Sequence, residues 1–292
     1  MVPDEHRRNV RPVGALTLQA PPAAQTGSTP VRVRDVLREA RDLFRHNAKP
    51  IMLPMAVVQV PLAVIGAIVP WVLYATVYSE QLHPFDAQAL TDGPRGLLFA
   101  LVVVAWIWIM FLALGFNSTI IAVRDARKGV RKPLAELLDP SFTHLGGLLV
   151  IALGAAALWF AILATSITVL APLVLLFTAL RLALTFHSFA LNDPRPRAAM
   201  SESWTLMRGN VIRLLGLLLG TLPAIMLMLL AGSLALVVVS IPFAVVGTSR
   251  GPTLAANAVG TMVLAIVLIP IFCYVTTATT LFYLNLTRRN SG

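Results

Sequence analysis

Residues 214–249 read LLGLLLGTLPAIMLMLLAGSLALVVVSIPFAVVGTS, a run of 36 positions without a charged side chain. About 20 apolar residues are enough for a helix to cross the hydrocarbon core of a bilayer. Backbone groups in lipid have no water to bond, so such a run is expected to be helical. The run therefore predicts a membrane span, and it sets the fold class as an all-α, polytopic membrane protein.

The composition of the whole chain agrees with this reading. Of the 292 residues, 57% are hydrophobic and 12% are charged, whereas a soluble domain carries about 25% charged residues. This balance excludes a soluble enzyme and a disordered chain. The one cysteine, Cys273, has no second cysteine to pair with, so a disulfide scaffold is excluded as well.

Long uncharged runs predict six transmembrane helices. The run 145–180 is too long for one span at about 1.5 Å rise per residue, so we place a turn at 165–172, which holds β-branched residues and Pro172. The run quoted above is expected to end its helix at Ile241, because the position before Pro242 disfavours helix. The predicted spans are about 51–78, 96–123, 145–167, 171–191, 212–241 and 255–287, inside a membrane domain over 31–290, and residues 1–30 are predicted as a disordered cytoplasmic tail.

The basic residues fall on alternate sides of these spans. Segments 1–50, 124–144, 192–213 and the C-terminal tail hold 20 of the 23 Lys and Arg residues, and the alternate loops hold only Arg95 and Arg250. Because cytoplasmic loops are enriched in Lys and Arg, this partition predicts cytoplasmic N- and C-termini. The net charge of +10 is then an orientation signal that needs no nucleic acid. The excess of Arg over Lys is typical of GC-rich bacteria, so we expect a bacterial inner membrane.

Three amphipathic segments precede the first, third and fifth spans, and helices of this kind lie along the membrane surface. Their apolar positions are Val33, Val36, Leu37, Ala40, Leu43 and Phe44 in the first, Leu134, Leu137 and Leu138 in the second, and Ala199, Met200, Ser203, Trp204 and Met207 in the third. In each segment a Glu (Glu39, Glu136, Glu202) is followed eight residues later by Asn47, His144 or Asn210. We expect a threefold repeat of interfacial helix plus transmembrane hairpin, with the helices on the cytoplasmic side.

Several short motifs carry a family resemblance. Residues 37–47 read LREARDLFRHN, residues 192–210 read NDPRPRAAMSESWTLMRGN and follow Arg181 in the fourth span, and residues 282–289 read FYLNLTRR. Together they resemble the bacterial membrane-domain family associated with glycerophosphoryl diester phosphodiesterases. The pattern A-x-x-x-S-W-x-L-x-x-G-N of that family is matched from Ala199 to Asn210 and includes Trp204. Since the chain lacks the acidic and histidine cluster of the phosphodiesterase domain, the resemblance implies a stand-alone membrane domain without catalysis.

Arg181 is the leading candidate site residue, because an ionised side chain inside a span is costly and normally faces a partner or a water-filled cavity. Two interpretations are open. The guanidinium has a structural partner, either a carboxylate such as Glu202 or carbonyl groups left free near Pro172, or it contacts an anionic ligand. His187 is a weaker candidate, either as a proton-relay group or as a satisfied interfacial residue, and Trp204 and Asn210 are further candidates.

No catalytic or metal motif stands out in the sequence. A Gly-rich phosphate loop, zinc-type His spacing and a nucleophile elbow are all missing. We therefore expect no cofactor and no metal. The favoured function is a non-catalytic membrane module that acts through lipids, anionic ones among them, or through a membrane-protein partner. A small transporter or permease subunit with Arg181 facing an intramembrane cavity is the alternative, and an intramembrane lipid enzyme is the third.

Overall fold

A computed structural model describes residues 32–77, 95–164, 170–246 and 250–290. These residues fold into helices, and strands are absent from these four ranges. The helices are α1 (Val33–Val77), α3 (Arg95–Arg127), α4 (Leu134–Thr143), α5 (Leu145–Ala164), α6 (Leu170–Leu182), α7 (Thr185–Leu191), α8 (Pro196–Leu206), α9 (Val211–Val246) and α10 (Arg250–Asn290). The prediction of an all-α protein is confirmed for this part of the chain, whereas the predicted tail 1–30 and the turn at 165–169 lie outside the described residues.

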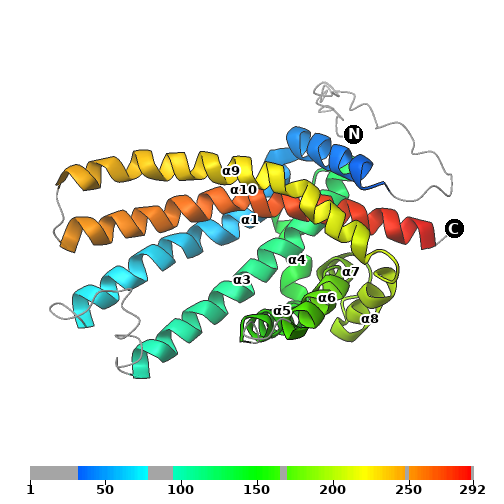
Figure 1. Ribbon diagram of the computed structural model, residues 1–292, viewed down its shortest axis with the longest axis horizontal. Coiled ribbons are helices and arrows are strands. Elements are labelled where there is room, and N and C mark those ends of the chain that lie inside the picture. The colour runs from blue at the N-terminus through cyan, green and yellow to red at the C-terminus, as the bar shows by residue number, and fades with distance from the viewer. Residues whose placement is uncertain (1–31, 78–94, 165–169, 247–249, 291–292) are drawn as a thin grey trace, which may run out of the picture.

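Within the described ranges, five stretches are long and apolar enough to cross a membrane: one each in α1, α3, α9 and α10, and one that runs through α6 and α7. The helices α4 and α5 meet at an angle of 76° and would supply a sixth span if they are counted as one broken unit. The long helices α1, α3, α9 and α10 extend together away from the end of the molecule where α4 to α8 gather (Figure 1). The described part of the chain is thus all-helical, with five to six helices that could span a membrane.

Two predicted span boundaries are wrong. The helix α9 does not stop at Ile241 but continues through Pro242 to Val246, and α10 already begins at Arg250 rather than near residue 255. A proline removes one backbone N–H from a helix. Ending the helix in an apolar environment would leave several backbone groups without partners, which costs more.

The fourth predicted span is not one helix over 171–191. It is broken between α6 and α7, at Ala183 and Leu184. At the break, the hydroxyl of Ser203 on α8 donates a hydrogen bond to the carbonyl oxygen of Arg181, at 2.8 Å. A side chain from α8 thus satisfies a carbonyl that an unbroken helix would pair internally.

The first amphipathic segment is the first third of α1, before a kink at Asn47 (φ −126°, ψ 29°). Its apolar face does not lie open but packs on α9 and α10, where Val36 and Ala40 share a core with Leu214, Leu217 and Phe282. The Asn47 amide donates to the Leu43 carbonyl oxygen at 3.3 Å, and the Asn210 amide donates in the same way to the Leu206 carbonyl oxygen at 2.9 Å. Both asparagines thus cap the helix that precedes a long apolar helix.

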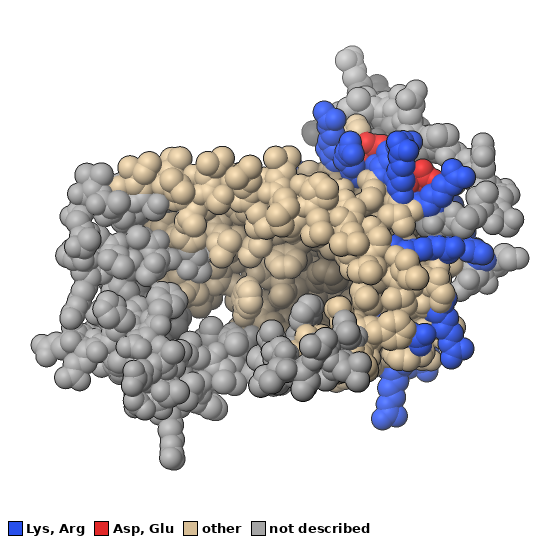
Figure 2. All heavy atoms as spheres, in the orientation of Figure 1, with Lys and Arg blue, Asp and Glu red and all other residues tan. Residues whose placement is uncertain are grey.

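Charge is concentrated at one end of the molecule. The start of α1 and the end of α10 lie at this end, and on the visible face the Lys and Arg side chains gather there while the rest of the described surface is largely uncharged (Figures 1 and 2). Large apolar side chains are exposed along α9, including Leu227, Leu234 and Val238 at 59 to 67%. An apolar belt with one basic end is the surface that a membrane protein presents to lipid.

Candidate functional site

Glu202 on α8 joins three segments of the chain at the basic end. Its carboxylate accepts hydrogen bonds from the Ser188 hydroxyl, from the Asn192 amide at 2.7 Å and from the Tyr283 hydroxyl at 3.0 Å. Ser188 belongs to α7 and Tyr283 to α10, and both are buried. Because three donors converge on one carboxylate, the charge is satisfied without a cation, and α7, α8 and α10 are held together.

Arg181 is not the partner of Glu202, and none of the ion pairs formed by the described residues joins them. The guanidinium carbon of Arg181 instead lies 5.0 Å from the ring centre of Phe177 and 4.6 Å from that of Trp204. These are cation–π distances. The Nε atom of Arg181 is buried and has no hydrogen-bond partner among the described residues. The structure thus brings together two predicted site residues, Arg181 and Trp204, in a different way from the ion pair we expected.

His187 is buried in α7 and lies within hydrogen-bond distance of Thr279 on α10, with 3.0 Å between Nε2 and Oγ1. Asp193, its neighbour in sequence, forms an ion pair with Arg195 instead, at 2.6 Å. The Arg195 guanidinium holds the pKa of the Asp193 carboxyl below its usual value. Since Ser188 bonds to Glu202, these residues do not form a Ser-His-Asp arrangement.

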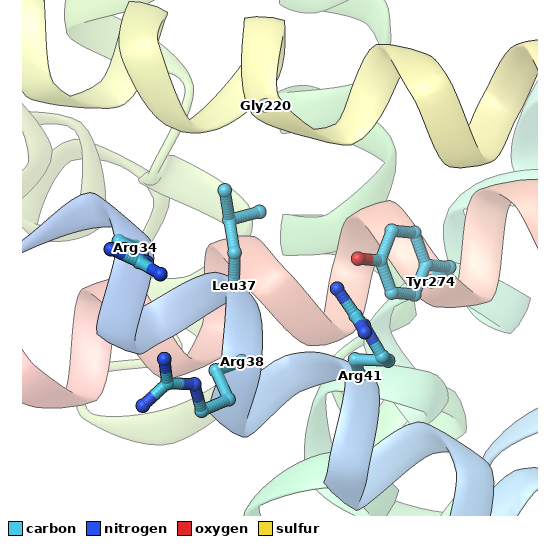
Figure 3. Close-up of a pocket in the computed structure, with 6 residues that line it drawn as sticks. All are labelled: Arg34, Leu37, Arg38, Arg41, Gly220 and Tyr274. Atoms are coloured by element: carbon cyan, nitrogen blue, oxygen red, sulfur yellow. The ribbon is translucent and has the colours of Figure 1, made fainter.

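A cavity of about 340 Å³ opens beside the first third of α1, and its lining includes Arg34, Arg38 and Arg41 on α1 and Tyr274 on α10. Figure 3 shows Leu37 pointing from α1 toward α9 at Gly220, with Arg41 and the Tyr274 phenol to one side of Leu37 and Arg34 and Arg38 to its other side. We call this space the α1 arginine cavity.

The amphipathic pattern of α1 places these groups. Arg34, Arg38 and Arg41 follow one another at intervals of four and three residues, so they share one helix face, while the buried residues Val36 and Ala40 lie on another. Gly220 lets α1 approach α9 closely, because a Cβ atom at this position would overlap the Leu37 side chain. Tyr274 is only 7% exposed, and the ring of Phe44 packs edge-on against it, with the ring centres 5.8 Å apart.

The three arginines of the α1 arginine cavity are among the basic side chains of the described residues that form no ion pair. Arg124 and Lys132 form ion pairs with Asp125, and Arg127 pairs with Glu39. Among the ion pairs of the described residues, Arg34, Arg38 and Arg41 have no carboxylate partner, and no acidic residue lines their cavity. These three residues were not among the site residues predicted from the sequence. Their regular spacing on an amphipathic helix was the signal that could have identified them as candidates.

Three unpartnered guanidinium groups beside an apolar wall can bind an anion that has an apolar body. Within the described residues there is no group of three or more His, Cys, Asp or Glu side chains that would hold a metal ion. No family model matches the chain, and neither a curated protein nor a solved structure matches it.

Proposed function

We propose that this chain is a non-catalytic, multi-pass membrane protein that binds the phosphate group of an anionic phospholipid in the α1 arginine cavity. The observation that carries the proposal is the convergence of Arg34, Arg38 and Arg41 on one cavity whose other walls are Tyr274, Leu37 and Gly220. Guanidinium groups match phosphate oxygens in geometry and charge. The less polar walls suit the glycerol and the first carbons of the acyl chains.

The depth of the cavity supports a lipid ligand. Its arginines come from the part of α1 before Asn47, which holds most of the charged residues of that helix, whereas Gly220 and Tyr274 lie in uncharged runs of α9 and α10. Charged and apolar residues thus meet at the cavity, as they do at the level of phospholipid headgroups. Basic residues at this level contribute about 1 kcal/mol each to the attraction of anionic lipid.

The same proposal includes the finer topology. Six spans with both termini in the cytoplasm of a bacterial cell would place the arginine-rich end against the anionic cytoplasmic leaflet. The breaks at Asn47, at His144 between α4 and α5, and at Asn210 support a threefold repeat of entry helix and hairpin. We further propose membership of the membrane-domain family associated with glycerophosphoryl diester phosphodiesterases, on the sequence motifs given above, with a membrane-protein partner as a second mode of action.

A transporter or permease subunit remains the second candidate function. One observation favours it, the buried Nε of Arg181 that lacks a hydrogen-bond partner among the described residues. The cation–π contacts with Phe177 and Trp204 favour a packing role for the same side chain. If the protein is a transporter, Arg181→Gln should abolish substrate movement in proteoliposomes although the variant still folds.

Native mass spectrometry of the full chain tests the lipid proposal. The protein is purified with equal amounts of phosphatidylglycerol and phosphatidylcholine, and the retained lipid is identified. We expect phosphatidylglycerol to be retained by the unmodified protein and to fall at least tenfold in the triple variant Arg34→Gln, Arg38→Gln, Arg41→Gln.

The matched control removes three positive charges elsewhere. Lys128, Arg131 and Arg197 are exposed and do not line the α1 arginine cavity. Their triple Gln variant should retain phosphatidylglycerol as the unmodified protein does. Equal loss in both triple variants, or equal retention of the two lipids by the unmodified protein, would contradict the proposal.

A further inference from the structure

A second cavity, of about 300 Å³, lies between the start of α9 and the end of α10. It is lined by Arg208, Gly209, Asn210, Arg213, Leu286 and Arg289. We call it the α9–α10 cavity. Three of its six lining residues are arginines from three separate places, the turn after α8, the first turn of α9 and the last turns of α10. No acidic residue lines it, and none of the ion pairs in the described ranges involves these arginines.

The local backbone brings two of these arginines to the cavity. Gly209 has a φ of +75°, which only glycine adopts readily, and it turns the chain from α8 into α9. The Asn210 side-chain oxygen accepts a hydrogen bond from Arg213 Nη1 at 2.9 Å, while its amide donates to the Leu206 carbonyl oxygen. Asn210 thus orients the Arg213 guanidinium without neutralising it.

The α9–α10 cavity differs from the α1 arginine cavity in both polarity and position. Leu286 is its one apolar lining residue, whereas the other cavity is walled by Leu37, Gly220 and Tyr274. Arg213 and Gly220 are seven residues apart on α9, so they lie on one helix face, with Arg213 about 10 Å nearer the charged end. This cavity therefore lies nearer the charged end of α9 than the α1 arginine cavity does.

From this geometry we propose that the α9–α10 cavity is a second anion site, which binds a water-soluble phosphate compound such as inorganic phosphate or a small phosphomonoester. Three guanidinium groups supply enough donors for a phosphate dianion. Because the α9–α10 cavity has no extended apolar wall, it does not suit the acyl chains of a lipid. The two sites are separate and take different ligands, so this inference does not rest on the lipid proposal.

The test uses the full chain in nanodiscs made of phosphatidylcholine only, with inorganic phosphate and glycerol 3-phosphate as probes in equilibrium dialysis. We expect saturable binding of one of the two probes, and at least tenfold weaker binding in the double variant Arg213→Gln, Arg289→Gln. The double variant Arg131→Gln, Arg197→Gln is the matched control and should bind the probes as the unmodified protein does. Circular dichroism and gel filtration identify variants that fold, and Arg208→Gln replaces any that does not.

Three outcomes would overturn the second site. The first is that the unmodified protein binds neither probe at millimolar concentration. The second is that the control variant loses as much binding as the variant of Arg213 and Arg289. The third is that phosphatidylglycerol in the nanodisc displaces the probe, which would show that the cavity binds a lipid headgroup. The Arg213→Gln, Arg289→Gln variant should still retain phosphatidylglycerol in native mass spectrometry. Failure of this site and failure of the lipid proposal can therefore be told apart.

Discussion

The Tyr283 hydroxyl on α10 donates a hydrogen bond to the Glu202 carboxylate on α8 at 3.0 Å, across 81 positions of sequence. Tyr283 is 1% exposed, and its ring lies beside that of His187, with the centres 6.0 Å apart. Through Glu202 the last long helix is tied to the short helix that precedes α9. The same carboxylate also accepts hydrogen bonds from Ser188 and Asn192.

The first prediction concerns this carboxylate. In Glu202→Gln one carboxylate oxygen becomes an NH₂ group that faces hydrogen-bond donors. Either the Ser188 hydroxyl, bonded to Oε2, or the Tyr283 hydroxyl and the Asn192 amide, bonded to Oε1, then lose their acceptor. We expect a loss of about 1–3 kcal/mol in the free energy of unfolding. Thermal unfolding in detergent, followed by circular dichroism, measures it as a lower Tm.

Glu136 provides the control for Glu202. It occupies the corresponding position of α4 but is exposed. Glu136→Gln should leave the Tm unchanged, while Tyr283→Phe should lower it by less than Glu202→Gln does, because only one of three hydrogen bonds is removed. An unchanged Tm in Glu202→Gln would show that the three hydrogen bonds contribute nothing to stability.

The second prediction concerns the contact between α1 and α9. A Cβ atom at Gly220 would overlap the Leu37 side chain, whereas at Gly216 the nearest atom would be Val33 Cγ2, at an ordinary 3.8 Å. We expect Gly220→Ala to destabilise the protein by about 1–3 kcal/mol, and Gly216→Ala, its control on the same helix, to be neutral or slightly stabilising. The same thermal unfolding experiment applies.

Repacking offers a further check on this contact. Leu37→Ala combined with Gly220→Ala should recover part of the stability that Gly220→Ala loses, because the overlapping side chain is then removed. If Gly216→Ala proved the more damaging change, or if the double variant were no more stable than Gly220→Ala, the close approach of α1 to α9 would be wrong.

The third prediction separates two interpretations of Arg181. The stacking of its guanidinium on Trp204 should appear as a coupling of about 0.5–2 kcal/mol in a double-mutant cycle of Arg181→Met and Trp204→Leu. The cycle of Arg181→Met and Glu202→Gln should show a much smaller coupling, because these side chains are not paired. A large coupling to Glu202 with none to Trp204 would restore the ion pair expected from the sequence.

The fourth prediction concerns the membrane topology. The native Cys273 is buried, so it should not react with a cysteine label, and the labelling of an introduced cysteine can be measured against it. Single cysteines are introduced at the exposed position Lys128 and at position 86, which lies between α1 and α3 in sequence. In intact cells a membrane-impermeant maleimide should label position 86 and not position 128. The opposite pattern would invert the proposed orientation, and labelling of both positions from outside would contradict the span count.

Much of this fold could be predicted from the sequence, because lipid imposes simple rules. Apolar runs became helices, and the amphipathic segment before the first span became the first third of α1. These features depend on local composition and spacing, which the sequence contains directly.

The errors arose where a distant side chain decides the local structure. The break between α6 and α7 depends on Ser203, 22 residues beyond Arg181, whose carbonyl oxygen it bonds. The partner of Arg181 depends on the rotation of α8 about its own axis. This rotation places Trp204 against Arg181, and it places Glu202 within hydrogen-bond distance of Ser188 and Tyr283. The α1 arginine cavity likewise needs α9 and α10 as walls, so helix spacing could have placed its arginines on one face but could not have shown that they line one space.

The most direct measurement of the central claim is photocrosslinking with phosphatidylglycerol that carries a diazirine on the first carbons of one acyl chain. After irradiation in nanodiscs, the labelled peptides are identified by mass spectrometry. We predict labels concentrated around Leu37, Gly220 and Tyr274, which line the α1 arginine cavity, and lost in the triple variant of Arg34, Arg38 and Arg41. Labels spread evenly over the exposed apolar face of α9, and unchanged in that variant, would contradict a lipid headgroup site in this cavity.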